Sequence, residues 1–258
     1  MTESDIITLS KPEKKLRFSA ALDFSYRPPF EAIFAERVPV LQAFALAMAN
    51  YSLLSSERRT FGLWGRVRRA LSSPVKAPFR AVECGVYTGS SLVACAKMAY
   101  DAGLSFEMIG LDTFSGLPEL SETDLRLAPA GAKYINTTLF ADTTFDHVQS
   151  KLVERGLAGS VQLRQGLFSQ TLPALPEQRY HFVNIDCDLY DPHLECLSYF
   201  YPRMVPGGIM FFDDYHSIDY PMAAHAINEF MQDKPEKLMH LRFGDDAANR
   251  TKCFFIKY

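Results

Sequence analysis

The sequence predicts an α/β fold, in which a mostly parallel sheet carries helices on both faces. From residue 79 onward, short apolar runs alternate with helical segments, which is the order of a parallel sheet with crossover helices. The first apolar run leads through a glycine turn into a helix. The chain closes with two apolar runs around a polar turn. They predict a C-terminal hairpin that adds an antiparallel strand, for a seven-stranded sheet.

The first 78 residues precede this pattern, and we expect them to form an arm and a helical segment. Residues 1–27 are polar and aperiodic, which predicts a loose arm. Residues 28–54 are apolar and rich in helix formers, with Pro39 as a break or a helix start. A proline-containing linker ends this part. The sequence therefore divides into an N-terminal segment, 1–78, and a main domain, 79–258.

A basic amphipathic helix is predicted at residues 61–71 within the N-terminal segment. Its apolar side chains share one face, and Arg66, Arg68 and Arg69 lie elsewhere on it. A solvated basic face is the simplest interpretation. Contact of these arginines with an anionic substrate or partner is the alternative.

The elements of the main domain follow from local signals in chain order. Runs rich in β-branched and aromatic residues predict strands, whereas helical spacing between a capping residue and a glycine predicts helices. The predicted strands lie within residues 79–89, 105–114, 161–168, 180–188, 207–214, 238–244 and 251–258. The predicted helices lie within residues 90–103, 142–157, 192–205 and 220–232.

Composition limits the class of protein. The 258 residues are 48% hydrophobic, enough for one sizeable core. A net charge of −3 argues against nucleic acid or an anionic membrane as partner. No apolar run approaches the roughly 18 residues of a membrane span, and the start has no signal-peptide core. The cysteines lack metal-type spacing and predict free thiols in a cytoplasmic protein. They are Cys84, Cys95, Cys187, Cys196 and Cys253.

The glycine turn reads ECGVYTGSS. Gly85 and Gly89 permit positive φ and let a ligand approach the backbone. The pattern is ExGxxxG, not the GxGxxG of dinucleotide-binding turns. Glu83 could meet an ammonium, while helix N–H groups and the hydroxyls of Ser90 and Ser91 meet a carboxylate. The methionine end of S-adenosylmethionine (SAM) carries both charges. A simple strand-to-helix turn is the alternative.

Asp112 ends the second predicted strand. Ligands of open parallel sheets bind outside the carboxyl ends of the strands. A carboxylate at this place can accept hydrogen bonds from both ribose hydroxyls of a nucleoside, and a turn cap is the alternative.

Two further predicted strands end on pairs of aspartates. Asp186 and Asp188 would share a face if the strand continued to the second of them, and Asp213 and Asp214 follow the next strand. If these strands are neighbours, their ends lie about 5 Å apart. Carboxylates at so short a distance need a cation between them, and a set of oxygen ligands alone favours Mg²⁺. The alternative is that the aspartates cap turns.

Such a site suits the methylation of an alcohol. Coordination to a metal lowers the pKa of a hydroxyl and aligns it with the sulfonium methyl group. One aspartate can then accept the proton while the others hold the metal. His216, beside the second aspartate pair, is another candidate base.

Several stretches together resemble the macrocin O-methyltransferase family of class I SAM-dependent enzymes. They read ECGVYTGSS, GLDTFSGLPE, GLFSQTLP, NIDCDLYD and PGGIMFFDDY, and the resemblance spans about residues 80–258. It implies a Rossmann-like class I methyltransferase fold. It also implies Mg²⁺-dependent methylation of a sugar hydroxyl, because members act on sugars of macrolide and aminocoumarin antibiotics. The acceptor would be a small-molecule glycoside or a glycan.

The resemblance also implies roles for individual residues. Asp186, Asp213 and Asp214 would bind the metal, and Asp188 would be the general base. The cofactor contacts would be Glu83, Gly85, Tyr87, Gly89, Ser90, Ser91, Asp112, Thr113, Ser115, Gly166, Leu167, Phe168 and Asp186. The N-terminal segment departs from the family pattern. In the family this region shapes the acceptor pocket and a subunit interface, so we expect a helical lid and a homo-oligomer.

Two other functions stay open. A catechol-type methyltransferase would use the same cofactor and Mg²⁺ on an aromatic diol, and Phe61, Trp64 and Tyr215 could clamp that ring. A SAM-binding protein without catalysis would have no use for a metal-and-base cluster.

Overall fold

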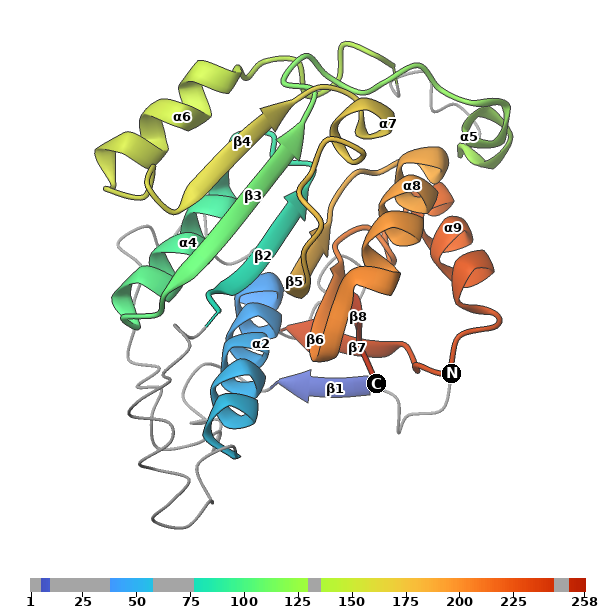
Figure 1. Cartoon of the computed structure of the whole chain (residues 1–258). Coiled ribbons are helices and arrows are strands. Elements are labelled where there is room, and N and C mark those ends of the chain that lie inside the picture. The colour runs from blue at the N-terminus through green and yellow to red at the C-terminus, as the bar shows by residue number, and fades with distance from the viewer. Residues whose placement is uncertain (1–5, 10–37, 58–76, 130–135, 244–250) are drawn as a thin grey trace, which may run out of the picture.

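The computed structural model describes residues 6–9, 38–57, 77–129, 136–243 and 251–258 (Figure 1). One sheet organises these residues, with the strand order β1-β7-β8-β6-β5-β2-β3-β4. The strands are β1 (Ile6–Leu9), β2 (Phe79–Cys84), β3 (Phe106–Asp112), β4 (Val161–Gln165), β5 (Tyr180–Ile185), β6 (Met204–Phe212), β7 (Met239–Phe243) and β8 (Thr251–Ile256). The helices are α2 (Val38–Glu57), α4 (Ser90–Asp101), α5 (Glu122–Leu127), α6 (Phe145–Glu154), α7 (Phe168–Thr171), α8 (Tyr190–Phe200), the 3₁₀ turn η2 (Tyr201–Arg203) and α9 (Pro221–Met231).

The predicted seven strands correspond to β2–β8, and the predicted C-terminal hairpin is confirmed. Strand β8 runs antiparallel to both β6 and β7. The other pairs of neighbouring strands are parallel. Strand β2 lies between β3 and β5. The chain therefore builds one half of the sheet through β3 and β4, and then returns across β2 to build the other half. Such a switch point opens a crevice at the carboxyl ends of the strands.

An eighth strand corrects the expectation of a loose arm over residues 1–27. Strand β1 pairs in parallel with β7, from Ile6 opposite His240 to Leu9 opposite Phe243. Its sequence, IITL, holds three β-branched residues, which favour strands. The rest of that arm lies outside the described residues, as does the predicted basic helix at 61–71.

Helices cover both faces of the sheet. On one face, α2, α4 and α6 pack in a cluster that includes the fully buried Phe44. The Phe44 ring meets the rings of Phe79 and Phe182 edge to face, with centroids 5.4 and 5.1 Å apart. On the other face, α7, α8 and α9 pack over a second cluster. Helix α2 is thus part of the main core. A lid or interface role for the N-terminal segment stays a prediction.

Local signals place most helix boundaries. Helix α2 begins at Val38, so Pro39 sits in its first turn, where a missing N–H costs nothing. Helix α4 follows Gly89 and is followed by Gly103, both in left-handed conformations with φ of +79° and +64°. The Thr144 hydroxyl caps α6 by accepting a hydrogen bond from a backbone N–H.

Several predicted strands stop earlier than expected, and the two described next end at the candidate site. The strand predicted over 161–168 stops at Gln165, because Gly166 has a φ of +140° and α7 begins shortly after it. The strand predicted over 180–188 stops at Ile185. Helix α5 was not predicted.

All five cysteines are buried free thiols, as predicted. Within the part of the chain that the structure describes, no helix combines the length and the apolar character that a membrane crossing requires.

Candidate active site

A cavity of about 450 Å³ opens at the carboxyl ends of β2, β3, β4, β5 and β6. That size suits a small molecule. The predicted site residues that line it are Gly85, Tyr87, Ser91, Asp112, Thr113, Gly166, Leu167, Phe168, Asp186, Asp188, Asp213 and Asp214. The predicted site residues that do not line it are Glu83, Gly89, Ser90, Ser115 and His216.

The glycine turn touches the loop that follows β5. Gly85 has a φ of +88°, and a Cβ atom added there would lie 1.6 Å from the carbonyl oxygen of Asp186. The amide of Asp186 donates a 2.8 Å hydrogen bond to the carbonyl of Cys84. Only glycine fits this position, since it combines a left-handed conformation with a close backbone approach. The turn and the first aspartate therefore hold each other in place.

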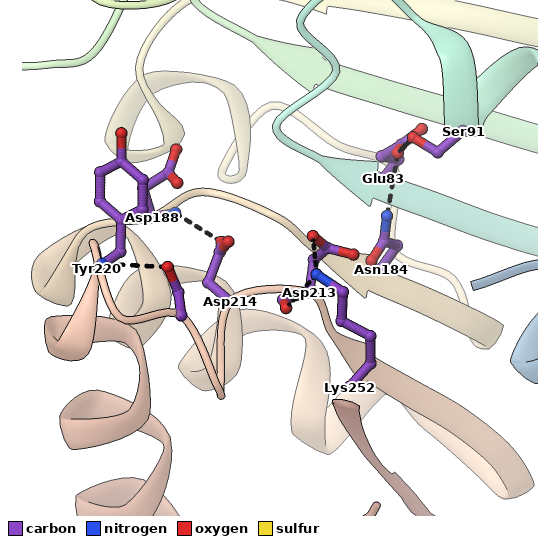
Figure 2. Close-up of polar contacts among 9 residues, drawn as sticks. Glu83, Ser91, Asn184, Asp188, Asp213, Asp214, Tyr220 and Lys252 are labelled. Carbon is purple, nitrogen blue, oxygen red and sulfur yellow. Dashed lines mark hydrogen bonds and ion pairs between the residues drawn. The ribbon is translucent and has the colours of Figure 1, made fainter. Parts of the chain in front are cut away.

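Glu83 lies behind the cavity wall. Its side chain is buried and accepts hydrogen bonds from the Ser91 hydroxyl and, at 3.0 Å, from the Asn184 amide (Figure 2). Ser91 lines the cavity, whereas Glu83 does not. The carboxylate therefore meets the cavity through Ser91, at the start of α4. The direct contact of Glu83 with the cofactor stays a prediction.

Asp112 ties the glycine turn to the end of β3. Its Oδ2 accepts hydrogen bonds from the amides of Val86 and Tyr87, at 2.7 and 2.8 Å. Its Oδ1 accepts one from the amide of Phe114 at 2.6 Å. A carboxylate has about four acceptor sites, so ribose hydroxyls would share the oxygens with these amides. Asp112 thus fixes the turn as well as facing the cavity.

Three carboxylates converge at the ends of β5 and β6. Asp186, Asp213 and Asp214 each place one oxygen within 4.8 Å of the others. The strands that carry them are parallel neighbours, with Ile185 opposite Phe212. One cation can bridge carboxylates at this spacing, and an all-oxygen set suits a hard ion. The ligand set predicted from the sequence is therefore brought together.

Asp188 reaches the same cavity by a different route from the one expected. The strand ends before it, and Asp188 has a φ of +60°, so strand alternation does not orient its side chain. Instead its amide donates a 3.0 Å hydrogen bond to Asp214 Oδ2 (Figure 2). Burial raises the pKa of Asp188 well above its usual range, and the charges of Asp214, Asp186 and Asp213 add to that rise.

Lys252, from β8, stands against this cluster and was not predicted. Its Nζ lies 2.6 Å from Asp213 Oδ2 and donates a 2.8 Å hydrogen bond to the Asp213 carbonyl (Figure 2). Burial lowers the pKa of Lys252, but the charge of Asp213 and its hydrogen bond outweigh burial and raise that pKa. Nothing near Lys252 in the sequence marks it, because only the pairing of β8 with β6 brings the two residues together.

His216 is not brought to the cavity. Its Nε2 lies 2.9 Å from Nδ1 of His240, on β7. The neighbouring Tyr215 hydroxyl donates a 2.8 Å hydrogen bond to Asn228. Neither His216 nor Tyr215 lines the cavity, which corrects the expectation that His216 could act as a base there. The other proposed clamp residues, Phe61 and Trp64, lie outside the described residues.

Aromatic side chains that sequence reasoning missed form another wall. Phe140 lies between Tyr87 and Tyr220, with ring centroids 5.2 and 6.5 Å away, and all three line the cavity. Phe140 has a φ of +63°, which is uncommon for a bulky residue. This backbone conformation marks Phe140 as unusual, but it cannot be recognised from the sequence.

The chain is similar to known proteins in sequence and in fold. A family model described as macrocin-O-methyltransferase (TylF) matches residues 59–240. The chain is 27% identical over 157 residues to a mycinamicin III 3''-O-methyltransferase of Micromonospora griseorubida, covering 59% of this chain and 60% of that protein. It is 27% identical over 140 residues to 8-demethyl-8-(2,3-dimethoxy-alpha-L-rhamnosyl)-tetracenomycin-C 4'-O-methyltransferase of Streptomyces olivaceus, covering 54% of this chain and 53% of that protein. The chain thus spans a little over half the length of these curated relatives.

Among solved structures, the O-methyltransferase NovP has a similar fold. The TM-score is 0.58 at 22% sequence identity, and the match covers 74% of this chain and 76% of NovP. The expected class I methyltransferase fold is thereby confirmed.

Proposed function

The chain belongs to the macrocin O-methyltransferase family, and we propose that it transfers the methyl group of SAM to a sugar hydroxyl of a glycosylated natural product with the help of Mg²⁺. The observation that carries this proposal is the direct contact between the two halves of the cavity. Gly85 of the glycine turn abuts the carbonyl of Asp186, whose side chain belongs to the carboxylate cluster. A methyl donor on the turn would therefore lie beside an acceptor held at the cluster.

The turn and the strand ends around it would hold the cofactor. The N–H groups at the start of α4 and the Ser91 hydroxyl would meet the carboxylate of SAM. Asp112 would meet the ribose, and Gly166, Leu167 and Phe168 would lie against the adenine. The cavity lining supports these roles, because each of these residues faces it.

The carboxylate cluster would hold Mg²⁺ through Asp186, Asp213 and Asp214. Their oxygens are close enough for one ion, and carboxylate oxygens are the ligands that this ion takes. Bound there, a divalent ion would lower the pKa of an acceptor hydroxyl.

Asp188 would accept the proton of that hydroxyl as its oxygen attacks the methyl carbon. SAM held at the glycine turn would supply the methyl group and would be left as S-adenosylhomocysteine. Asp188 lines the cavity beside the cluster, and a carboxylate in that place can act as a general base. The hydrogen bond from its amide to Asp214 would keep Asp188 beside the cluster.

The aromatic wall supports a sugar as the acceptor. Phe140 and Tyr220 line the cavity with their ring centroids 6.5 Å apart, and aromatic faces pack well against the apolar face of a sugar ring. The name of the Streptomyces relative specifies a rhamnosyl group, which fits this chemistry. A catechol clamp is less well supported, since Tyr215 does not line the cavity.

The test is a panel of glycosides and catechols with labelled SAM, run with and without EDTA. We expect label in a glycoside, loss of turnover with EDTA, and recovery with Mg²⁺. Label in catechols alone would contradict the sugar acceptor. Full turnover in protein shown by elemental analysis to be free of metal would contradict the metal.

A further inference from the structure

Lys252 places a fixed positive charge at the edge of the carboxylate cluster. Register pairs Cys253 of β8 with Phe212 of β6, so Lys252 lies alongside Asp213, the first residue after β6. Both oxygens that it contacts, Oδ2 and the main-chain carbonyl, belong to Asp213. The antiparallel strand thus supplies a cation to a site made by two parallel strands.

The pair is shielded from solvent. The Lys252 side chain is 17% exposed and that of Asp213 is 14% exposed. Exposed ion pairs are weakened by water and salt, whereas shielded pairs keep most of their attraction. Lys252 therefore acts on the cluster as a permanent charge and not as a loose surface partner.

This charge has opposite effects on the two states of the cluster. Without a metal, Lys252 offsets the mutual repulsion of Asp186, Asp213 and Asp214, and so stabilises the fold. With a metal, it would repel the ion, and it already contacts one oxygen of a candidate ligand, Asp213 Oδ2. The same contact therefore stabilises the empty site and opposes the filled one.

We propose that Lys252 is a positioning residue that holds Asp213 in place without metal and lowers the affinity of the cluster for a divalent cation. The inference rests on the proposed metal site. It concerns a residue outside the proposed ligand set. It would explain how a site with three carboxylates binds its ion reversibly.

The test measures metal binding to the purified protein, without cofactor or acceptor. Mg²⁺ is titrated by calorimetry and Mn²⁺ by electron paramagnetic resonance. Removing the charge in Lys252→Met should tighten both affinities by about ten- to a hundredfold. The metal-free melting temperature should fall, and Mg²⁺ should raise it by more than in the wild type.

Three further variants separate charge from structure. Lys252→Gln keeps a donor for the Asp213 oxygens and should tighten binding as Lys252→Met does, which gives the answer even if the methionine variant fails to fold. Lys252→Arg keeps the charge and should bind like the wild type. Lys97→Met removes the lysine of a surface pair with Asp101 and should change nothing.

Unchanged or weaker metal binding in both neutral variants, with normal binding of S-adenosylhomocysteine, would overturn the inference while leaving the metal site intact. Absence of metal binding in the wild type and in all three Lys252 variants would instead remove the metal from the proposed function, and this inference with it. Binding in the neutral variants but not in the wild type would support the inference in its strongest form.

Discussion

The main-chain amide of Asp188 donates a 3.0 Å hydrogen bond to the Oδ2 of Asp214. The bond joins the candidate base to a candidate metal ligand on the next strand. Asp188 itself has a left-handed backbone conformation, with a φ of +60°. The base and the candidate ligand are therefore held at a fixed spacing by the backbone.

Asparagine variants should separate the roles of Asp186 and Asp188. Asparagine keeps the size of the side chain but loses its charge and basicity. We expect Asp188→Asn to lose turnover by about 10²–10⁴-fold with near-normal affinity for Mg²⁺ and SAM. Its residual rate should rise with pH as hydroxide replaces the base. Asp186→Asn should need more Mg²⁺ and be partly rescued by it.

Metal titrations and pH–rate profiles of both variants decide the matter. Rescue of Asp188→Asn by Mg²⁺, without rescue of Asp186→Asn, would mean that the two roles are reversed. Normal turnover in both would mean that the aspartates only cap the end of β5.

Replacing Asp112 should weaken cofactor binding in two ways. Asp112→Asn loses charge-assisted hydrogen bonds to a ribose, and it keeps only one of the two oxygens that accept from the amides of Val86, Tyr87 and Phe114. We expect calorimetry with S-adenosylhomocysteine to show a loss of about 1–3 kcal/mol. Urea unfolding without the cofactor should show that the variant also loses folding stability, by less than it loses in cofactor-binding free energy. Unchanged affinity would remove Asp112 from the cofactor site.

Alanine variants of Gly85 and Gly103 test the close contact between the glycine turn and Asp186, with Gly103 as the control. Both have positive φ, but a Cβ atom at Gly103 would meet nothing within 4 Å, whereas at Gly85 it would strike Asp186. Gly103→Ala should cost only the conformational penalty of about 1–2 kcal/mol. Gly85→Ala should cost more than about 4 kcal/mol, because the loop after β5 must move. Equal costs in urea unfolding would argue against the contact.

Glu236 should make stability depend on pH. Burial opposes its ionisation, but hydrogen bonds from Lys257 and Tyr201 outweigh burial and hold its pKa below the usual range. An unfolded glutamate titrates near pH 4.3. Because the folded pKa is lower, the stabilisation is complete above about pH 4.3 and is lost as the pH falls through the folded value.

Glu236→Gln should therefore lower the free energy of unfolding by about 1–3 kcal/mol at pH 7, and the difference should shrink in acid. The control is Glu177→Gln, because Glu177 pairs with Arg203 at 3.1 Å while its side chain is 76% exposed. That variant should cost less than about 1 kcal/mol. A difference for Glu236→Gln that grows toward low pH would contradict the assigned direction of its pKa.

Much of this protein can be predicted from the sequence alone, wherever a local pattern carries the information. The alternation of strands and helices, the turn at Gly85 and the aspartates at two strand ends follow from side-chain period and turn chemistry, which act over a few residues. The position of Asp186 and Asp213 at the same edge of the sheet also follows, since parallel strands end at one edge, whereas only the pairing of β5 with β6 makes them neighbours.

Only the tertiary structure decided the rest, because it depends on contacts between distant segments. The pairing of β8 with β6 sets Lys252 against Asp213, and no local pattern encodes that pairing. Asp188 lies after the end of β5 in a left-handed conformation, so strand alternation does not set the direction of its side chain. The His216 side chain contacts His240 on β7 and does not line the cavity. The sequence by itself therefore determined which residues stand at the strand ends, and long-range packing determined where their side chains point.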